Sequence, residues 1–283
     1  MKLTVPNQPP ALIDLLQEAY PDCSKSTLRS WIKGGRIAVD GAVVTRTDRA
    51  LLAAQSVTVA PKALHLAEEI QVLYEDEDVV VLIKPAGLLS VATEFKKNRT
   101  VHEILKRRSR GKRVFPVHRL DRDTSGVMVF TYHERSRDHL KEQFAQHGIE
   151  KLYYAIVEGK PESPKGTWES FLQEDAMFFV KSSESGKLAV TQYEEVAGNK
   201  RFTLLRLRPL TGRKNQLRVH CSEAGIPILG DEKYGAQTAS GKRLFLHAQS
   251  LKFTHPTSGK RMNFSIPLPE EFRKIVKFTN LNI

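Results

Sequence analysis

Short apolar runs with the length of β-strands, and few long helical patterns between them, dominate the chain beyond residue 70. The clearest run covers residues 79–83, and the turn-forming residues 84–87 end it. One short helix is expected over residues 100–108. Many strands with few long helices indicate an α+β domain around a mixed, largely antiparallel sheet. We expect this larger, catalytic domain to cover residues 70–283.

The first part of the chain has a different pattern. Apolar residues recur at helical spacing over residues 11–19, and a second helical pattern follows. A glycine pair ends that helix, and the hairpin signal Asp40-Gly41 then separates two short strands. We therefore expect a small α+β module over residues 9–60 and a linker over residues 61–69.

The second helix of this module carries evenly spaced cations. They are Lys25, Arg29, Lys33 and Arg36, and the first three share one side of a helix. The order helix, turn, basic helix, Gly-Gly, strand, Asp-Gly, strand resembles the S-four-type RNA-binding module, named after a small-subunit ribosomal protein. The resemblance implies that these four residues contact RNA. A solvated helix face that binds nothing has the same spacing.

The charge balance favours an anionic partner without proving one. The net charge is +12, and such an excess attracts a polyanion through long-range forces and counterion release. No apolar run approaches the roughly 18 residues that span a bilayer, and the first ten residues lack a signal-peptide pattern. We therefore expect a cytoplasmic monomer without a membrane partner. Cys23 and Cys221 lie outside any metal-ligand spacing, so we expect free thiols and no metal site.

Residues 115–130 are the most informative stretch, because two apolar strands flank a polar loop there. Within the loop, Asp121 lies between Arg119 and Arg122. Adjacent cations favour the carboxylate form that a nucleophile or base needs. An Asp that caps a turn and pairs with arginine would look the same. Leu120 interrupts the His-Arg-Asp of a kinase loop, and no Gly-x-Ser-x-Gly nucleophile elbow is present here.

The loop string His-Arg-Leu-Asp-x-x-Thr-Ser-Gly resembles the signature of the RluA-type pseudouridine synthases at every fixed position. The family pattern Lys-x-Tyr-x-Ala-x-Val occurs at residues 151–157. The pattern Thr-Gly-Arg-x-His-Gln-Leu-Arg-x-His occurs at residues 211–220, with Asn215 in place of the first His. Gly-x-Pro-x-x-Gly-Asp-x-x-Tyr-Gly and Leu-His-Ala follow. The resemblance covers residues 72–269.

The resemblance implies an isomerisation without a cofactor. The bond between uracil and ribose breaks, the base rotates, and it is rejoined through carbon. Asp121 would attack either the sugar or the base, and Tyr153 would stack on the flipped base and help to remove the carbon-bound proton. Arg218 would hold Asp121 through two parallel hydrogen bonds. Further substrate contacts are expected from Arg119, Arg122, Thr124, Arg213, Asn215 and Leu246.

Two alternatives belong to other classes of protein. A non-catalytic RNA-binding or ribosome-assembly factor on the same fold should have lost at least one of Asp121, Tyr153 and Arg218. A glycoside hydrolase needs a second carboxylate about 5–9 Å from the first, and no motif supplies one. Family members with the N-terminal module mostly act on large-subunit ribosomal RNA, while several without it act on transfer RNA. The resemblance therefore favours ribosomal RNA.

Overall fold

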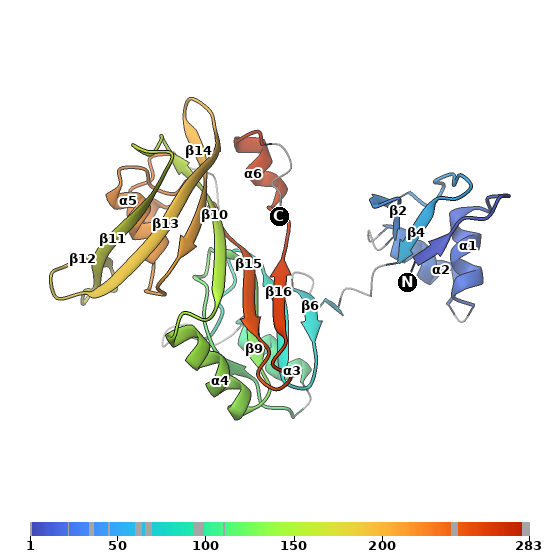
Figure 1. Cartoon of the computed structure of the whole chain (residues 1–283), viewed down its shortest axis with the longest axis horizontal. Helices are drawn as coiled ribbons and strands as arrows, with labels where there is room; N and C mark the ends of the chain where they lie inside the picture. The colour runs from blue at the N-terminus through green and yellow to red at the C-terminus, as the bar shows by residue number, and fades with distance from the viewer. Residues whose placement is uncertain are drawn as a thin grey trace. The chain divides into compact units, whose positions relative to one another are not determined.

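The computed structural model describes residues 2–21, 23–33, 37–44, 46–59, 64–65, 70–92, 99–109, 111–238 and 243–278. Contacts divide the chain into a smaller unit, Met1–Leu64, and a larger unit, His65–Ile283. Each unit combines helices with a sheet, which confirms the predicted α+β class (Figure 1). Within the described ranges, no helix has the length and apolar character needed to cross a membrane.

The smaller unit packs two helices against a four-stranded antiparallel sheet with the order β1-β4-β2-β3. Its elements are α1 (Leu12–Ala19), α2 (Lys25–Lys33), β1 (Lys2–Thr4), β2 (Ile37–Val39), β3 (Ala42–Val44) and β4 (Ser56–Val59). Apolar faces of both helices share one buried cluster with the strands, which includes Leu16 and Ile32. Asp40 and Gly41 have φ values of 49° and 82°, as an Asp-Gly hairpin turn requires.

Two boundaries differ from those expected. The sheet of the smaller unit begins before residue 9, because β1 pairs with β4. Three residues carry too little alternation to be recognised as a strand. In addition, β5 (Leu64–His65) falls within the predicted linker and forms an edge of the large sheet. The other residues of the range 61–69 lie outside the described residues.

The larger unit is built on a twelve-stranded sheet with the main order β12-β11-β13-β14-β10-β15-β9-β7-β6-β5. Its strands are β6 (Gln71–Glu75), β7 (Val79–Lys84), β8 (Phe115–Pro116), β9 (Ser125–Thr131), β10 (Glu150–Glu158), β11 (Lys165–Glu174), β12 (Val180–Ser182), β13 (Lys187–Gly198), β14 (Phe202–Pro209), β15 (Leu246–Thr254) and β16 (Arg261–Ser265). Its helices are α3 (Val101–Arg108), α4 (Glu134–Ala145), α5 (Gln216–Glu223), α6 (Glu270–Ile275) and the 3-10 helix η1 (Glu232–Tyr234). The β9–β15 pair is parallel and its neighbours are antiparallel, which confirms a mixed, largely antiparallel sheet.

The parallel pair places the signature loop next to the start of β15. Ser125 is in register with His247, and Gly126 with Ala248. Gly126 has a φ of 129°, and a Cβ at this position would lie 2.2 Å from the carbonyl oxygen of Ala248. Only glycine allows the two strands to approach this closely. The glycine of the signature thus has a structural reason that is independent of catalysis.

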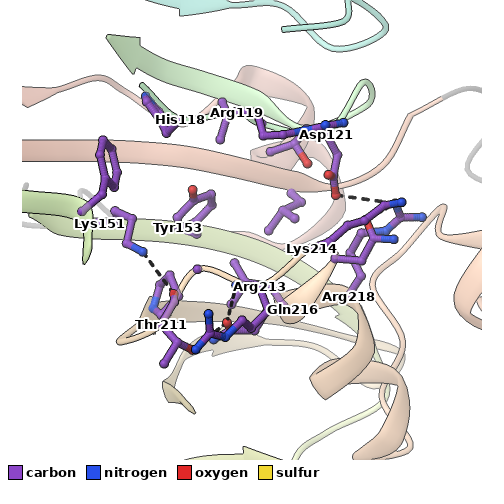
Figure 2. Close-up of a pocket in the computed structure, with 18 of the residues that line it drawn as sticks. His118, Arg119, Asp121, Lys151, Tyr153, Thr211, Arg213, Lys214, Gln216 and Arg218 are labelled. Carbon is purple, nitrogen blue, oxygen red and sulfur yellow. Dashed lines mark hydrogen bonds and ion pairs between the residues drawn. The ribbon is translucent and has the colours of Figure 1, made fainter. Parts of the chain in front are cut away.

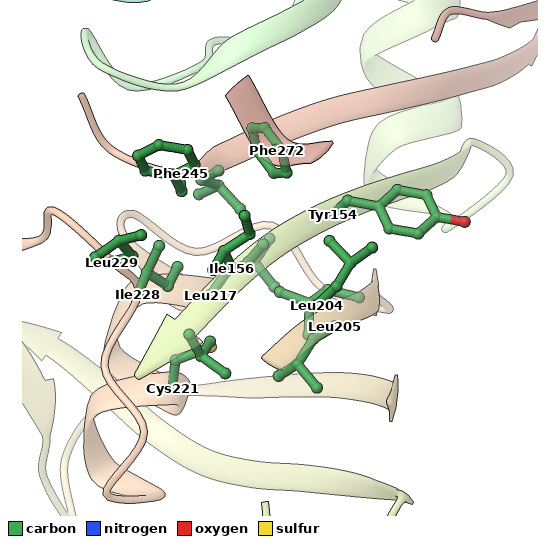
Figure 3. Close-up of a cluster of buried hydrophobic side chains, with 14 of the residues drawn as sticks. Tyr154, Ile156, Leu204, Leu205, Leu217, Cys221, Ile228, Leu229, Phe245 and Phe272 are labelled. Atoms are coloured by element: carbon green, nitrogen blue, oxygen red, sulfur yellow. The ribbon is translucent and has the colours of Figure 1, made fainter. Parts of the chain in front are cut away.

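Two buried clusters of the larger unit both contact Tyr153. One joins β10, β14, α5 and α6, and it contains Tyr154 and Cys221 (Figure 3). The other joins β7, β9 and α3. Tyr153 packs against both clusters, whereas Tyr154 is a core residue, as expected for the second tyrosine of the motif. Cys221 is a free, fully buried thiol, and burial raises its pKa.

Candidate active site

The predicted site residues of the larger unit, apart from Arg122, gather around one cavity of about 540 Å³ (Figure 2). Its walls come from the signature loop, from β10, from residues 209–218 and from the first residue of β15. The volume lies within the range of ligand-binding clefts. The predicted residues on its wall are Arg119, Asp121, Thr124, Tyr153, Arg213, Asn215, Arg218 and Leu246.

The backbone around Asp121 is fixed on its N-terminal side by Ser90. The Ser90 hydroxyl donates to the carbonyl oxygen of Leu120 at 2.7 Å and accepts from the Leu120 N–H at 3.1 Å. The Leu120 side chain is buried in the core. The carbonyl oxygen of Asp121 then accepts from the N–H of Thr124 at 3.2 Å, which closes a turn. The loop is therefore a rigid support for the Asp121 carboxylate.

Lys84 is the second anchor of this loop, and the sequence patterns did not indicate it as a site residue. Its side chain is fully buried, and Nζ donates to the carbonyl oxygens of Pro85, Leu88 and Arg122 at 2.7–2.8 Å. Burial lowers the pKa of Lys84 to about 7, and nearby carboxylates oppose this effect. The three acceptors use all three N–H groups of an ammonium, so the charged form holds the loop. A lysine ending an apolar strand was the only signal available.

Arg218 lies between two carboxylates. Its Nη1 is 3.6 Å from Oδ2 of Asp121, while Nε and Nη2 donate to the two oxygens of Asp231 at 2.7 and 2.6 Å. The expectation of two parallel bonds from Arg218 to Asp121 was therefore wrong. The Asp231 side chain is fully buried and needs both bonds, whereas Asp121 remains partly exposed to the cavity. Burial opposes the charge of Arg218, but its bonds to Asp231 and the nearby Asp121 raise its pKa.

Asn215, which departs from the resembled family pattern, contacts Arg218. It immediately precedes α5 with a φ of 53°, a conformation that asparagine tolerates. Its Nδ2 donates to the Tyr234 hydroxyl at 2.9 Å, and its Oδ1 accepts from Arg218 Nη1 at 3.4 Å. The Arg218 guanidinium also lies 4.9 Å from the centre of the Tyr234 ring. Asn215 thus positions Arg218 without adding a charge.

Tyr153, Leu246 and Thr124 form the remaining wall near Asp121. Burial, together with the charge of Asp121, raises the pKa of Tyr153, so its phenol keeps its proton at neutral pH. Leu246 lines the cavity and also belongs to the core cluster. The Thr124 side chain is buried, and its Oγ1 has no hydrogen-bond partner among the described residues. A ligand in the cavity could satisfy that hydroxyl.

Residues 78–223 match the family model described as RNA pseudouridylate synthase. The chain belongs to this family. Ribosomal large subunit pseudouridine synthase D of Pseudomonas aeruginosa is 33% identical, covering 92% of this chain and 89% of the relative. The tRNA pseudouridine synthase C of Haemophilus ducreyi is 34% identical, covering 73% of this chain and 94% of the relative.

A solved structure supports the same assignment. Human RNA Pseudouridylate Synthase Domain Containing 4 has a TM-score of 0.59 and 25% identity, covering 71% of this chain and 89% of the human chain. The predicted family, fold class and enzyme class of the synthase are therefore confirmed. The individual roles of its site residues stay predictions.

The two arginines that flank Asp121 in the synthase signature differ in position. Arg119 is exposed and lines the cavity. Arg122 donates from Nε and Nη2 to the neighbouring Asp123 at 3.0 and 3.1 Å, and it is not on the cavity wall. The described cation that pairs with Asp121 is Arg218, because the chain folds α5 against the signature loop. A contact between Arg122 and substrate stays a prediction for the surface outside the cavity.

Gln216 explains why the synthase needs an amide directly after Asn215. Its Oε1 accepts from the Thr211 hydroxyl at 2.7 Å and from the Arg213 N–H at 3.0 Å. Its Nε2 donates to the Val190 carbonyl and to the Thr191 hydroxyl, both at 2.9 Å. The turn that carries Arg213 is thereby fixed to β13. All four hydrogen-bonding positions of the amide are used inside the protein.

Two histidines form hydrogen bonds with residues of β9: His118 is partly buried and lines the cavity, and His247 is buried. His118 Nε2 accepts from the N–H of Val129 at 3.1 Å. The Ser125 hydroxyl accepts from Arg243 Nη2 at 2.7 Å, so it donates to His247 Nδ1 at 2.8 Å. Burial, with a smaller effect of nearby cations, lowers the pKa of both histidines to about 3. Both rings are therefore neutral structural groups.

The predicted RNA contacts of the smaller unit are only partly described. Lys25 forms an exposed ion pair with Asp14 of α1 at 3.0 Å, a partner that the pattern within α2 did not reveal. Arg29 is exposed. The side chain of Lys33 and the whole of Arg36 lie outside the described residues.

Proposed function

We propose that this synthase isomerises uridines of large-subunit ribosomal RNA to pseudouridine, with Asp121 as the nucleophile. One observation carries the proposal: Asp121 is the one carboxylate among the described residues that line the cavity, and Arg218 Nη1 lies 3.6 Å from it. Asp231, which fixes Arg218, is fully buried and has both oxygens occupied. A glycoside hydrolase needs two carboxylates facing its substrate, so the cavity disfavours that alternative.

The reaction moves one bond within the nucleotide. The bond from ribose C1′ to uracil N1 breaks, the base turns, and a bond from C1′ to C5 forms as the C5 proton leaves. Asp121 can start this sequence at the sugar or at the base. The wall formed by Tyr153 and Leu246 suits the apolar faces of a uracil that has left its stack. Because the Tyr153 phenol keeps its proton, ring contact with the base is its better supported role.

The choice of ribosomal RNA rests on how much of the chain each relative matches. The relative named for the large ribosomal subunit aligns with 92% of this chain. The relative named for transfer RNA aligns over nearly its whole length but matches only 73% of this chain. We infer that the smaller unit is the extra part, an S-four-type module that helps to bind ribosomal RNA in the cytoplasm. The net charge of +12 supports a polyanionic substrate.

Pseudouridine mapping of total RNA from cells with and without the protein tests this proposal. We expect at least one position in large-subunit RNA to lose its modification when the protein is absent. Purified protein should restore it in a transcript of the same RNA. A loss confined to transfer RNA would overturn the ribosomal assignment, and no loss in either RNA, together with no activity on the transcripts, would overturn the function.

A further inference from the structure

A second charged group enters the same cavity away from Asp121. Lys151 lies on β10 two residues before Tyr153, so strand alternation places both side chains on one face. In Figure 2, Tyr153 lies between Lys151 and the Asp121–Arg218 pair. Lys151 Nζ donates to the carbonyl oxygen of Thr211 at 3.1 Å. An ammonium has three N–H groups, so two of them have no partner within the described part of the chain.

Among the described cations on the cavity wall, Lys151 is the partly buried one that has no carboxylate partner, whereas Arg119 and Arg213 are exposed. Arg218 is bonded to Asp231, and Lys214 pairs with Glu174. No described acidic side chain pairs with Lys151, and burial alone lowers its pKa to about 8. A partly buried cation without a counter-ion is destabilising by itself. An anion brought by the ligand would remove this cost.

The groups around Lys151 do not supply that anion. His118, which lines the same end of the cavity, is neutral because burial and the charge of Lys151 lower its pKa to about 3. Its Nε2 already accepts the N–H of Val129. Phe144 stacks on His118 with ring centres 4.9 Å apart, and the described residues that line the cavity include no carboxylate besides Asp121.

We propose that Lys151 binds a backbone phosphate of the RNA next to the flipped uridine. This inference rests on the proposed function, because it assumes that the base lies between Tyr153 and Asp121. The sugar–phosphate chain that leaves the base must then pass the rest of the cavity, and phosphates are the anions that RNA carries. Lysine binds phosphate as a point charge. A uracil carbonyl carries no net charge, so it would leave the ammonium uncompensated.

The test measures RNA binding separately from catalysis. Lys151→Gln is made in Asp121→Asn protein, and binding to transcribed large-subunit ribosomal RNA is measured at several salt concentrations. Gln keeps a donor for Thr211 but removes the charge. We expect affinity to fall about tenfold, as for one charge-assisted hydrogen bond. The slope of log affinity against log salt should fall by about 0.7–0.9.

Lys252→Gln is the matched control. Lys252 lies on the neighbouring strand β15 and pairs with the exposed Glu150, so the variant removes the same charge outside the cavity. We expect a change in slope well below that of Lys151→Gln. Lys151→Met is a second variant in case Gln disturbs folding, and thermal unfolding shows which of them is intact.

Equal affinity and equal salt slope for the folded Lys151 variant and its parent would overturn the proposal. So would weaker binding with an unchanged slope, because the interaction with RNA would then be uncharged. RNA binding and pseudouridine formation are measured separately, so the two proposals can fail independently. Pseudouridine formation by wild-type protein on the same transcript tests the proposed reaction, and the binding assay tests the Lys151 contact.

Discussion

The cavity of the larger unit and the basic helix α2 of the smaller unit both present cations, but they hold them differently. Arg218 has a bidentate carboxylate partner, Asp231, which is fully buried. On α2, Lys25 pairs with Asp14 between two exposed side chains, a contact that contributes only about 0–1 kcal/mol. A cation held in one position, such as Arg218, suits a reaction in which groups must be placed exactly. An exposed cation, such as Lys25, suits the binding of a flexible polyanion. Turnover and affinity should therefore respond to different regions.

Among changes to charged groups other than Asp121 itself, the largest effect is expected from Asp231→Asn, which removes the carboxylate that fixes Arg218. The amide can accept one hydrogen bond but presents an NH₂ group where the guanidinium needs an acceptor. We expect turnover to fall by about 10²-fold, because a small displacement near reacting atoms has effects of that order. Breaking a buried pair should also lower the free energy of unfolding by about 3–5 kcal/mol. Single-turnover kinetics below the unfolding temperature measure the first effect and denaturant titration the second.

Asp123→Asn is the control for that variant. Asp123 pairs with the exposed Arg122 outside the cavity wall, so both turnover and stability should stay close to wild type. Equal losses of turnover and stability for Asp123→Asn and Asp231→Asn would contradict this prediction. They would show that the effect of an ion pair here does not depend on its burial.

The second prediction compares the stability of the two units as pH falls. The smaller unit contains no histidine, whereas the partly buried His118 and the buried His247 are neutral in the larger unit. Both pKa values are lowered to about 3 in the folded protein, while an unfolded histidine binds its proton below about 6.5. From pH 6.5 to 4.5 the unfolded chain therefore binds more protons. The larger unit should lose up to about 1.4 kcal/mol per pH unit for each histidine.

Tryptophan fluorescence separates the two units in this experiment. Trp31 lies in the smaller unit and Trp168 in the larger, and the chain has two tryptophans. Denaturant titration of Trp31→Phe protein at pH 6.5 and 4.5 follows Trp168 alone. An unfolding free energy that does not decrease over this range would contradict the neutral state of the two histidines. Replacing His247 by Gln should reduce the pH slope.

The smallest effect on turnover is expected from changing Lys25, Arg29, Lys33 and Arg36 together to Ala. RNA binding should weaken, and the salt slope should fall by roughly 0.7–0.9 for each phosphate that these side chains no longer bind. Turnover at saturating RNA should change much less, because Asp121, Tyr153 and Arg218 lie in the other unit. Binding titrations over a range of salt concentrations provide the measurement. Equal affinity and salt slope for the wild type and the quadruple variant would mean that this face of α2 is solvated and does not bind RNA. RNA binding would then depend on the basic residues 106–113.

The sequence indicated the cavity residues most clearly where those residues lie close together in one motif. Asp121, Thr124 and Gly126 lie within one signature, and the fold brings that signature to Tyr153 and Leu246 at one cavity. The family motifs predict that segments far apart in the sequence lie together in the fold. Hydrophobic periodicity alone does not predict this. The α+β class and the hairpin at Asp40 followed from local patterns, because strand length and turn chemistry are local properties.

The sequence could not indicate contacts that depend on tertiary approach. Asp231 was part of a recognised string, yet its bonds to Arg218 exist only because η1 packs against α5. Lys84 and Ser90 support the signature loop from about 30 residues away or more, through backbone carbonyls that no side-chain pattern reveals. The pairing of Arg122 with Asp123 instead of Asp121 depends on rotamers. These contacts position Asp121 and Arg218, so the sequence patterns indicated residues that share the cavity but not the groups that support them.

Single-turnover pseudouridine formation by wild-type and Asp121→Asn protein on the same large-subunit transcript tests the central claim most directly. Asn has the shape of Asp but cannot act as a carboxylate nucleophile, and the loop that holds it stays anchored by Ser90 and Lys84. We predict that the variant binds the transcript with wild-type affinity and salt slope and forms no pseudouridine. Measurable turnover by the variant on a uridine that the wild type modifies would contradict the assignment of Asp121 as nucleophile.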